Sequence, residues 1–514
     1  MTLSTKPRHW RDVVGAAALG IMLAVPAGQA LAQNLTFEGS TFVNKGLVGV
    51  ARVPSDAKDA FRETLGGFGS AMAFVPGTWR QDRDGTYSGQ LWMVPDRGWN
   101  TQGTLDFRGR TQHFSVKLNP FYGASTNAQN QLSMHYEGLT PLRRFGVPTT
   151  GLDAVNVLRG THHFPDLPAG EDHHIAVDNE GIVIPSDGTF WISDEYGPYV
   201  YHYAHGGELL GVIRPPEAFI PRRLDASNHP VESFSANSPP IGETYDLGNP
   251  VSGRQNNQGF EGLALSPDGQ TLFVLLQSAL IQDLDPNNIK TTRRNTRLLA
   301  YDISRPAPRL IHEYVVQLPL FQDQTTTKTK LLIAAQSEMF ALNDHQFLVL
   351  ARDSSVGEIA PATPGSVYRS VDLIDTKGAT DIAGTSYDSA TGSVAPLGVL
   401  NPAITPVAYQ QFLNINDNGQ LNRFGLHNGA PADANDLYEK WESLAVEPVG
   451  DRAHPNDYFL FIGSDNDFIT QKGFMAGAAY SDSSGYNVDT LVLVYRVTLP
   501  TYVPPHHGHG GHGR

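Results

Sequence analysis

A repeated pattern of short apolar runs constrains this chain more than any other feature of its sequence. Each copy begins with Glu and a small or apolar residue, continues as a strand-like run and a polar turn, and ends in a second run that closes on polar or charged residues. Four copies start at Glu180, Glu261, Glu338 and Glu442. Helical periodicity is nearly absent, so the pattern indicates many paired strands.

A degenerate copy precedes these four, between Gly67 and Gly98, and has Gly69 where the others have Glu. The turns within the copies include Ser186-Asp187-Gly188 and Pro267-Asp268-Gly269. Such tripeptides are typical of tight hairpins. Each copy is therefore expected to open with a β-hairpin.

Further strand-like sequence follows the hairpins, at 199–213, 297–318, 366–374 and 491–498. Four antiparallel strands per unit, repeated around an axis, predict an all-β fold, a single β-propeller. Five units are visible, and the pattern leaves a sixth blade open in 120–178 or 395–440.

The copies start about 80–100 residues apart, whereas compact blades need about 40–50. Long inter-strand loops are therefore expected to decorate the blades. Strands near 35–50 are expected to pair with the strand at 491–497 and close the ring, which removes exposed sheet edges.

The N-terminal segment has the pattern of a secretory signal peptide. Lys6, Arg8 and Arg11 precede an apolar run over 13–25, and Ala30-Leu31-Ala32 supplies a small-x-small cleavage site. We therefore expect a signal peptide at 1–32, a propeller domain at 33–498 and a flexible His/Gly-rich tail at 499–514. Export to a bacterial periplasm or the medium follows. No later apolar run reaches the roughly 20 residues of a membrane span.

Composition narrows the classes of function. The chain of 514 residues contains no cysteine and has a formal net charge of −15. Disulfides, thiolate metal sites and a cysteine nucleophile are excluded. The acidic balance argues against a nucleic-acid partner, because phosphate backbones demand a basic surface. It leaves cation binding and simple solubility open, and the oligomeric state is undetermined.

The repeat predicts a site because the start of the first strand in a hairpin lies beside the end of the second. If each first strand is the innermost of its blade, the polar ends of all units surround one mouth of the central channel. The expected metal ligands are Glu180, Asp194, Glu195, Glu261, Glu338, Asp353, Glu442, Asp465 and Asp467. The expected catalytic residues are Asp96, Arg97 and Arg352.

Clustered carboxylates favour a hard cation, Ca²⁺ above all. A bound Ca²⁺ can polarise a phosphate that arginines clamp. For any single carboxylate of the set, capping a turn or pairing with arginine is the stronger interpretation. Recurrence at equivalent hairpin ends favours a functional role for the set as a whole.

Several short motifs resemble the phytase-like family, also described as "esterase-like activity of phytase". They are Gly66-Gly67, Asp96-Arg97-Gly98, the segments 191–198 and 257–264, Glu442-Ser443-Leu444 and the segment 463–468. The resemblance implies a secreted β-propeller related to calcium-dependent alkaline phytases, with hydrolysis of a small-molecule phosphoester as its chemistry. Two alternatives stay open: a non-catalytic, Ca²⁺-stabilised propeller that binds a ligand or protein partner, and a carboxylic-ester or lactone hydrolase.

Overall fold

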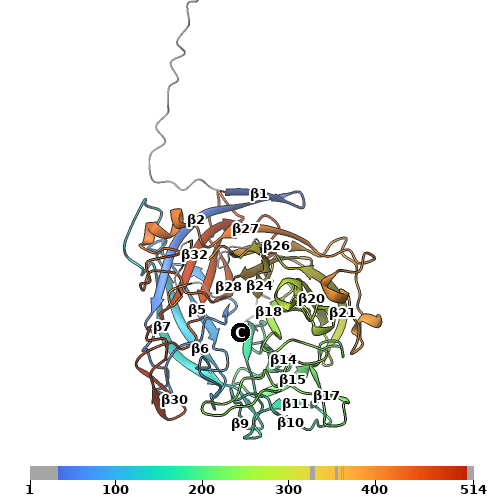
Figure 1. The fold of residues 1–514 in the computed structure, drawn as a ribbon. Coiled ribbons are helices and arrows are strands. Elements are labelled where there is room, and N and C mark those ends of the chain that lie inside the picture. The colour runs from blue at the N-terminus through green and yellow to red at the C-terminus, as the bar shows by residue number, and fades with distance from the viewer. Residues whose placement is uncertain (1–32, 324–329, 354–356, 361, 363, 506–514) are drawn as a thin grey trace, which may run out of the picture.

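The computed structural model describes residues 33–323, 330–353, 357–360, 362 and 364–505. The predicted signal peptide at 1–32 and most of the predicted His/Gly-rich tail, residues 506–514, lie outside the described residues. Within the described ranges the structure has five sheets of four or five strands, arranged around a common axis (Figure 1). This confirms the predicted all-β propeller, with five blades.

Each blade is an antiparallel sheet whose strands follow one another outward from the axis. The first contains β3 (Ala71–Phe74), β4 (Arg80–Gln81), β5 (Tyr87–Val94), β6 (Arg110–Leu118) and β7 (Leu132–Pro141). The second contains β12 (Asn179–Val183), β13 (Phe190–Asp194), β14 (Val200–Tyr203) and β15 (Leu209–Ile213). The third contains β18 (Phe260–Leu265), β19 (Thr271–Leu276), β20 (Asn295–Asp302) and β21 (Arg309–Gln317).

The fourth blade contains β24 (Ala335–Ala341), β25 (Gln346–Arg352), β26 (Arg369–Asp375) and β27 (Ala408–Asn414). The fifth contains β28 (Trp441–Pro448), β29 (Asp457–Ser464), β32 (Thr490–Thr498), β2 (Ser40–Val53) and β1 (Gln33–Phe37). Strands β3, β12, β18, β24 and β28 are innermost, and each contacts the innermost strands of both neighbouring blades. The hairpin starts therefore do surround one channel.

The fifth blade joins the two ends of the chain. Strand β2 pairs antiparallel with β32, from Val43 opposite Thr498 to Val53 opposite Thr490. Asp457 of β29 reinforces this junction, because it accepts hydrogen bonds from Lys45 of β2 at 2.7 Å and from Arg496 of β32 at 2.7 Å. The predicted ring closure is confirmed.

The long connections carry short strand pairs and short helices. The pairs are β8 (Arg143–Arg144) with β9 (Val147–Pro148), β10 (Asn156–Leu158) with β11 (Leu167–Ala169), β16 (Arg222–Leu224) with β17 (Pro230–Glu232), β22 (Leu320–Gln322) with β23 (Leu331–Ile333), and β30 (Gly473–Met475) with β31 (Ala478–Tyr480). The helices are α1 (Ile289–Thr292), α2 (Asn418–Leu421), η1 (Ile281–Asp283), η2 (Ser386–Asp388), η3 (Pro396–Gly398) and η4 (Asn422–Phe424).

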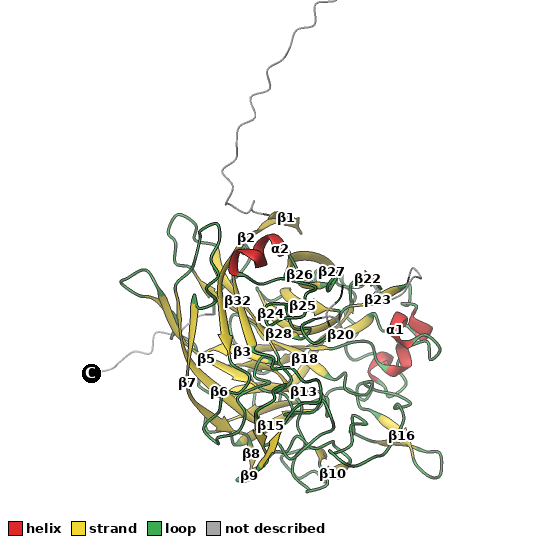
Figure 2. Cartoon of the chain, turned by 60° about the vertical axis from the view of Figure 1, so that its left-hand side comes forward, coloured by secondary structure: helices red, strands yellow, loops and turns green. Residues whose placement is uncertain are grey.

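Helices α1 and α2 lie at the periphery, as Figure 2 shows. Among the described residues, no helix has the length and hydrophobicity of a membrane span. The described parts of 120–178 and 395–440 hold strands of the first and fourth blades, short pairs and loops, so they form no sixth blade.

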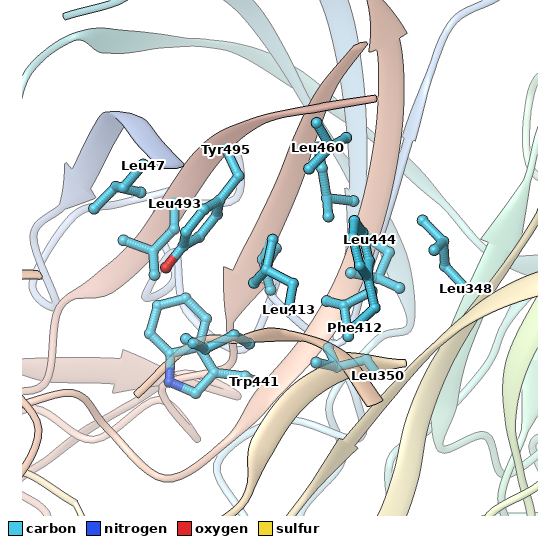
Figure 3. Packing of buried hydrophobic residues seen from close by; sticks show 14 of the residues in the cluster. Leu47, Leu348, Leu350, Phe412, Leu413, Trp441, Leu444, Leu460, Leu493 and Tyr495 are labelled. Carbon is cyan, nitrogen blue, oxygen red and sulfur yellow. The ribbon is translucent and has the colours of Figure 1, made fainter. Parts of the chain in front are cut away.

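The core lies between the faces of adjacent blades. Figure 3 shows one such layer, in which Leu350 and Leu413 of the fourth blade pack toward Trp441 and Leu460 of the fifth. Alternate residues of each strand face opposite neighbours. Because every blade face meets another blade, the strands read as nearly continuous apolar runs, and the rigid packing fixes the ends of the innermost strands.

Candidate metal and anion site

A β-bulge lies near the start of an innermost strand in four blades. In the third blade Phe260 pairs with Leu276 and Gly262 with Leu275, so Glu261 is the extra residue. Glu442 is the extra residue of β28 in the same way, and the register of β12 shifts between Asn179 and Ile182, around Glu180. A bulge re-aims side chains away from the regular pleat. The recurring glutamates of three blades therefore share one unusual local geometry.

The first of two carboxylate groups contains Asp178, Glu180 and Glu195. One oxygen of each lies within 4.8 Å of the others, and all three side chains are buried. Arg97 donates from Nη1 to Asp178 Oδ2 at 2.8 Å and also to Asn257 Oδ1. Burial raises the pKa of Asp178 to about 7, although the Arg97 guanidinium opposes the shift.

The second group contains Asp96, Asp465 and Asp467, which meet the same 4.8 Å criterion. Lys440 donates to Asp465 Oδ2 at 2.9 Å and to Asp467 Oδ1 at 2.8 Å. Burial raises the pKa of Asp96 to about 8 against the opposing charge of Lys440. The ammonium group already supplies this group with a cation.

Glu261 and Glu442 link the two groups. Arg352 donates to Glu442 Oε1, and the side chain of Gln277 donates to Glu261 Oε1. Glu261 Oε2 is buried and has no hydrogen-bond partner among the described residues. The pKa values of Glu180 and Glu261 both lie well above the usual range. Burial is the main cause, and the negative charges of neighbouring carboxylates add to it. In the described part of the chain, the carboxylate of Glu180 likewise meets no hydrogen-bond donor.

Negative charge exceeds positive charge in this cluster, which we name the carboxylate cluster. Eight buried carboxylates belong to it: Asp96, Asp178, Glu180, Glu195, Glu261, Glu442, Asp465 and Asp467. Arg97, Arg352 and Lys440 are the cations in direct contact with them. Arg254 lies nearby, but its guanidinium donates to backbone carbonyls such as that of Tyr196. Buried carboxylates at this density repel one another unless a cation or protons neutralise them.

Three predicted ligands lie apart from the carboxylate cluster or are engaged elsewhere. Asp194 accepts backbone N–H groups of Asp178 at 2.8 Å and Gly197 at 2.6 Å, which holds the turn after β13. Asp353 accepts the backbone N–H groups of Val367 and Tyr368 after β25.

Glu338 is the third, and the structure does not bring it to the mouth with the other glutamates. In the fourth blade the extra residue of the bulge is Ser337, because Gln336 pairs with Ala351 and Glu338 with Leu350. Glu338 is therefore one position beyond the recurring glutamates. It accepts the backbone N–H of Leu263 at 3.0 Å and thereby links two innermost strands.

Sequence reasoning missed Asp178 and Lys440, although the repeat holds a signal for both. Each lies two residues before a recurring glutamate, Asp178 before Glu180 and Lys440 before Glu442. The predicted catalytic residues do lie in the cluster: Arg97 and Arg352 form ion pairs there, and Asp96 belongs to the second group.

Comparison with known proteins gives the same family as the motifs. The family model "Phytase-like: Esterase-like activity of phytase" matches residues 64–468. A protein of Arthroderma benhamiae, named "Uncharacterized secreted protein", is 44% identical over 464 residues, which cover 84% of this chain and 88% of that protein.

Solved structures give only weak similarity. A chain from a Saccharomyces cerevisiae assembly of variant Dbp5 and Gle1 with Nup159, IP6 and ADP has a TM-score of 0.26 at 6% identity, covering 89% of this chain and 97% of that one. A proposed 6-phosphogluconolactonase of Bacteroides fragilis has a TM-score of 0.24 at 8% identity, covering 81% and 86%. Neither score bears on function. The family model and the fungal relative together show that the chain belongs to the phytase-like family.

Proposed function

We propose that this protein is an exported phosphoric ester hydrolase whose carboxylate cluster holds a divalent cation, Ca²⁺. One observation carries the proposal: the cluster has eight buried carboxylates and three cationic side chains, which contact only four of the carboxylates, and Glu261 Oε2 has no donor among the described residues. A divalent cation would compensate this excess charge. The family description is consistent with ester hydrolysis.

The donor set fits a hard cation. Its described members offer carboxylate oxygens and no imidazole, and the chain contains no cysteine. Oxygen ligands favour Ca²⁺ or Mg²⁺, whereas Zn²⁺ and Cu²⁺ favour nitrogen and sulfur. Asp178, Glu180, Glu195 and Glu261 would hold the ion, because Lys440 already contacts Asp465 and Asp467 of the second group, whereas Arg97 contacts only Asp178 of the first.

The three basic residues favour an anionic substrate. The side chains of Arg97 and Arg352 are each 9% exposed and that of Lys440 is 19% exposed, whereas most of the carboxylates are more deeply buried. Guanidinium groups bind phosphoryl oxygens through paired N–H donors. When bound, the cation would supply a Lewis acid for a phosphoryl oxygen. Arg97 and Arg352 would orient the substrate, and their small number favours a single phosphoryl group over a highly phosphorylated ligand.

Export is part of the proposal. The pattern at 1–32 and the description of the fungal relative as secreted support it. We propose cleavage after Ala32 and release to the periplasm or the medium. Mass spectrometry of the mature protein should give an N-terminus at Gln33, and a retained segment 1–32 on exported protein would contradict this.

Activity is tested with p-nitrophenyl phosphate and bis(p-nitrophenyl) phosphate, after EDTA treatment and after addition of CaCl₂ or MgCl₂. We expect EDTA to abolish phosphate release and Ca²⁺ to restore it. Glu180→Gln should lower the rate at least about tenfold, which corresponds to about 1.4 kcal/mol, while Glu171→Gln, at an exposed glutamate, should not.

Failure to hydrolyse either ester with metal present would overturn the proposed activity. p-Nitrophenyl acetate and a γ-lactone distinguish the carboxylic-ester and lactone alternative. A rise in melting temperature with Ca²⁺ and no turnover of any ester would identify the non-catalytic alternative.

A further inference from the structure

A cavity lies at the opposite end of the channel from the carboxylate cluster. The cluster gathers at the starts of the innermost strands, whereas this cavity is lined by their later residues and by the turns that follow, including Pro185–Asp187 and Pro267–Gly269. Its volume is about 660 Å³. We name it the distal cavity. Small-molecule sites have volumes of about 300–1,000 Å³, so its size suits one small ligand.

The walls of the distal cavity hold somewhat more apolar than polar surface. All five innermost strands contribute, with side chains such as Met72, Ile182, Leu265, Met339 and Leu444. The packing of the blades fixes these strands, so the cavity exists without rearrangement. Apolar walls on several sides would remove the hydrocarbon part of a ligand from water, worth about 25 cal/mol per Å² of buried apolar surface.

The charged side chains of the distal cavity all have the same sign. Asp187, Asp268, Glu338 and Glu447 line it, and no Lys, Arg or His belongs to its described lining. Glu447 is only partly buried, and burial raises its pKa to about 8. Among the described residues its carboxylate meets no hydrogen-bond donor, unlike that of Glu338, which accepts the backbone N–H of Leu263. Glu447 is therefore available to a ligand.

We propose that the distal cavity binds a small molecule with an apolar body and one protonated amine, whose ammonium group pairs with Glu447. The amine would supply the donors and the charge that Glu447 lacks, while its hydrocarbon part packs on the inner strands. The exposed carboxylates of Asp187 and Asp268 would repel an anion. The inference is independent of the proposed hydrolase activity, because it uses the other end of the channel.

The C-terminal segment is the alternative occupant. Tyr502–Pro505 line the cavity, and the sequence continues from Pro505 with residues 506–514, which include four histidines and Arg514. A variant that ends at Pro505 distinguishes the two occupants. We expect its affinity for a free amine to lie within about twofold of the full chain. A gain of about tenfold or more, equivalent to 1.4 kcal/mol, would show that the tail competes for the cavity and would overturn the proposal.

Isothermal titration with octylamine, octanol and octanoate at pH 7.5 tests the ligand class. We expect octylamine to bind about tenfold more tightly than octanol, as one partly buried ion pair allows, and octanoate not to bind. Glu447→Gln should remove the preference for the amine but keep the affinity for octanol. Glu171→Gln, at an exposed glutamate away from the cavity lining, should change neither.

A second variant tests the location independently of charge. Leu265 ends β18 at the cavity and is half-buried, so Leu265→Trp should fill space without disturbing the buried core. It should weaken octylamine and octanol alike. Absence of octylamine binding, an unchanged amine preference in Glu447→Gln, or unchanged affinity in Leu265→Trp would each overturn the assignment.

Discussion

The Nζ atom of Lys440 lies 2.9 Å from Oδ2 of Asp465, deep in the carboxylate cluster. The same ammonium group lies 2.8 Å from Asp467 and 3.4 Å from Glu442. Lys440 thus contacts two members of the second group, whereas in the first group Arg97 contacts only Asp178, and Glu180 and Glu195 form no ion pair among the described residues. This difference in ion pairing is the reason for placing the proposed metal ion in the first group.

Replacing Lys440 with Met should destabilise the protein in EDTA by about 3 kcal/mol, because the buried carboxylates that Lys440 contacts would lose their positive partner. Ca²⁺ should restore part of the lost stability, since the carboxylate oxygens that no longer contact Lys440 can bind the ion. Denaturant unfolding with and without CaCl₂ measures both effects. Lys472→Met is the matched control, because Lys472 is 76% exposed and 3.7 Å from Asp56. Equal effects of the two substitutions would contradict the role of Lys440.

Glu180→Gln should act in the opposite direction in the absence of metal. Burial is the largest cause of the raised pKa of Glu180. The negative charges of Glu261, Asp178 and Glu195 raise this pKa further. A neutral amide removes this repulsion, so the melting temperature in EDTA should rise, while the further increase on addition of Ca²⁺ should shrink. A variant that is less stable in EDTA and keeps its full response to Ca²⁺ would exclude Glu180 as a ligand.

Stability without metal should fall as the pH rises. Burial raises the folded-state pKa of Asp178 to about 7 and that of Asp96 to about 8, whereas both titrate near 4 when unfolded. Between these pKa values the folded state retains protons that the unfolded state has lost. The contribution of the two carboxyl groups to the free energy of unfolding is therefore fully present below about pH 4 and is lost as the pH rises through 7 to 8. Melting curves in EDTA from pH 5 to 9 test this. With Ca²⁺ bound the slope should flatten, and a steep slope that persists in Ca²⁺ would contradict it.

Gly69→Ala should destabilise the first blade by several kcal/mol. A Cβ at Gly69 would lie 1.9 Å from the backbone oxygen of Ser464, and a backbone atom cannot move aside cheaply. Gly77→Ala is a useful comparison for steric contact, because a Cβ there meets nothing within 4 Å, although its φ of +75° adds strain of its own. Thermal unfolding should show a clearly larger loss for Gly69→Ala. Similar losses would mean that the fifth blade adjusts its backbone at Ser464.

The sequence predicts the propeller because every blade repeats the same apolar hairpin, although the local pattern leaves a sixth blade open beside the five visible units. It predicts for the same reason that polar residues gather at one mouth of the channel, since Glu261 and Glu442 occupy equivalent positions in their blades. Blade packing places those residues together without any information on loops. Short segments and their order along the chain are thus enough to predict both the family and the fold.

The sequence does not reveal the register of each bulge. Glu338 follows Ser337 by one residue, and that single step moves its carboxylate to the backbone N–H of Leu263. Asp194 and Asp353 lie at strand ends, as Glu195 and Asp465 of the carboxylate cluster do, yet they accept backbone N–H groups of the following turns. A carboxylate at a strand end suits both roles, and only the path of the next few residues decides between them.

The pairing of β2 with β32 places a condition on how the ring assembles. Synthesis proceeds from the N-terminus, so the 14 residues of β2 emerge long before their partner strand, which ends at Thr498. Strand β1 pairs with β2 only over Ser40–Asn44, so until then the apolar remainder of β2 is unpaired, the kind of segment that promotes association with other chains. Contacts so distant in sequence also form slowly. The ring therefore cannot close until β32, the last of the described strands to be synthesised, is available to pair with β2.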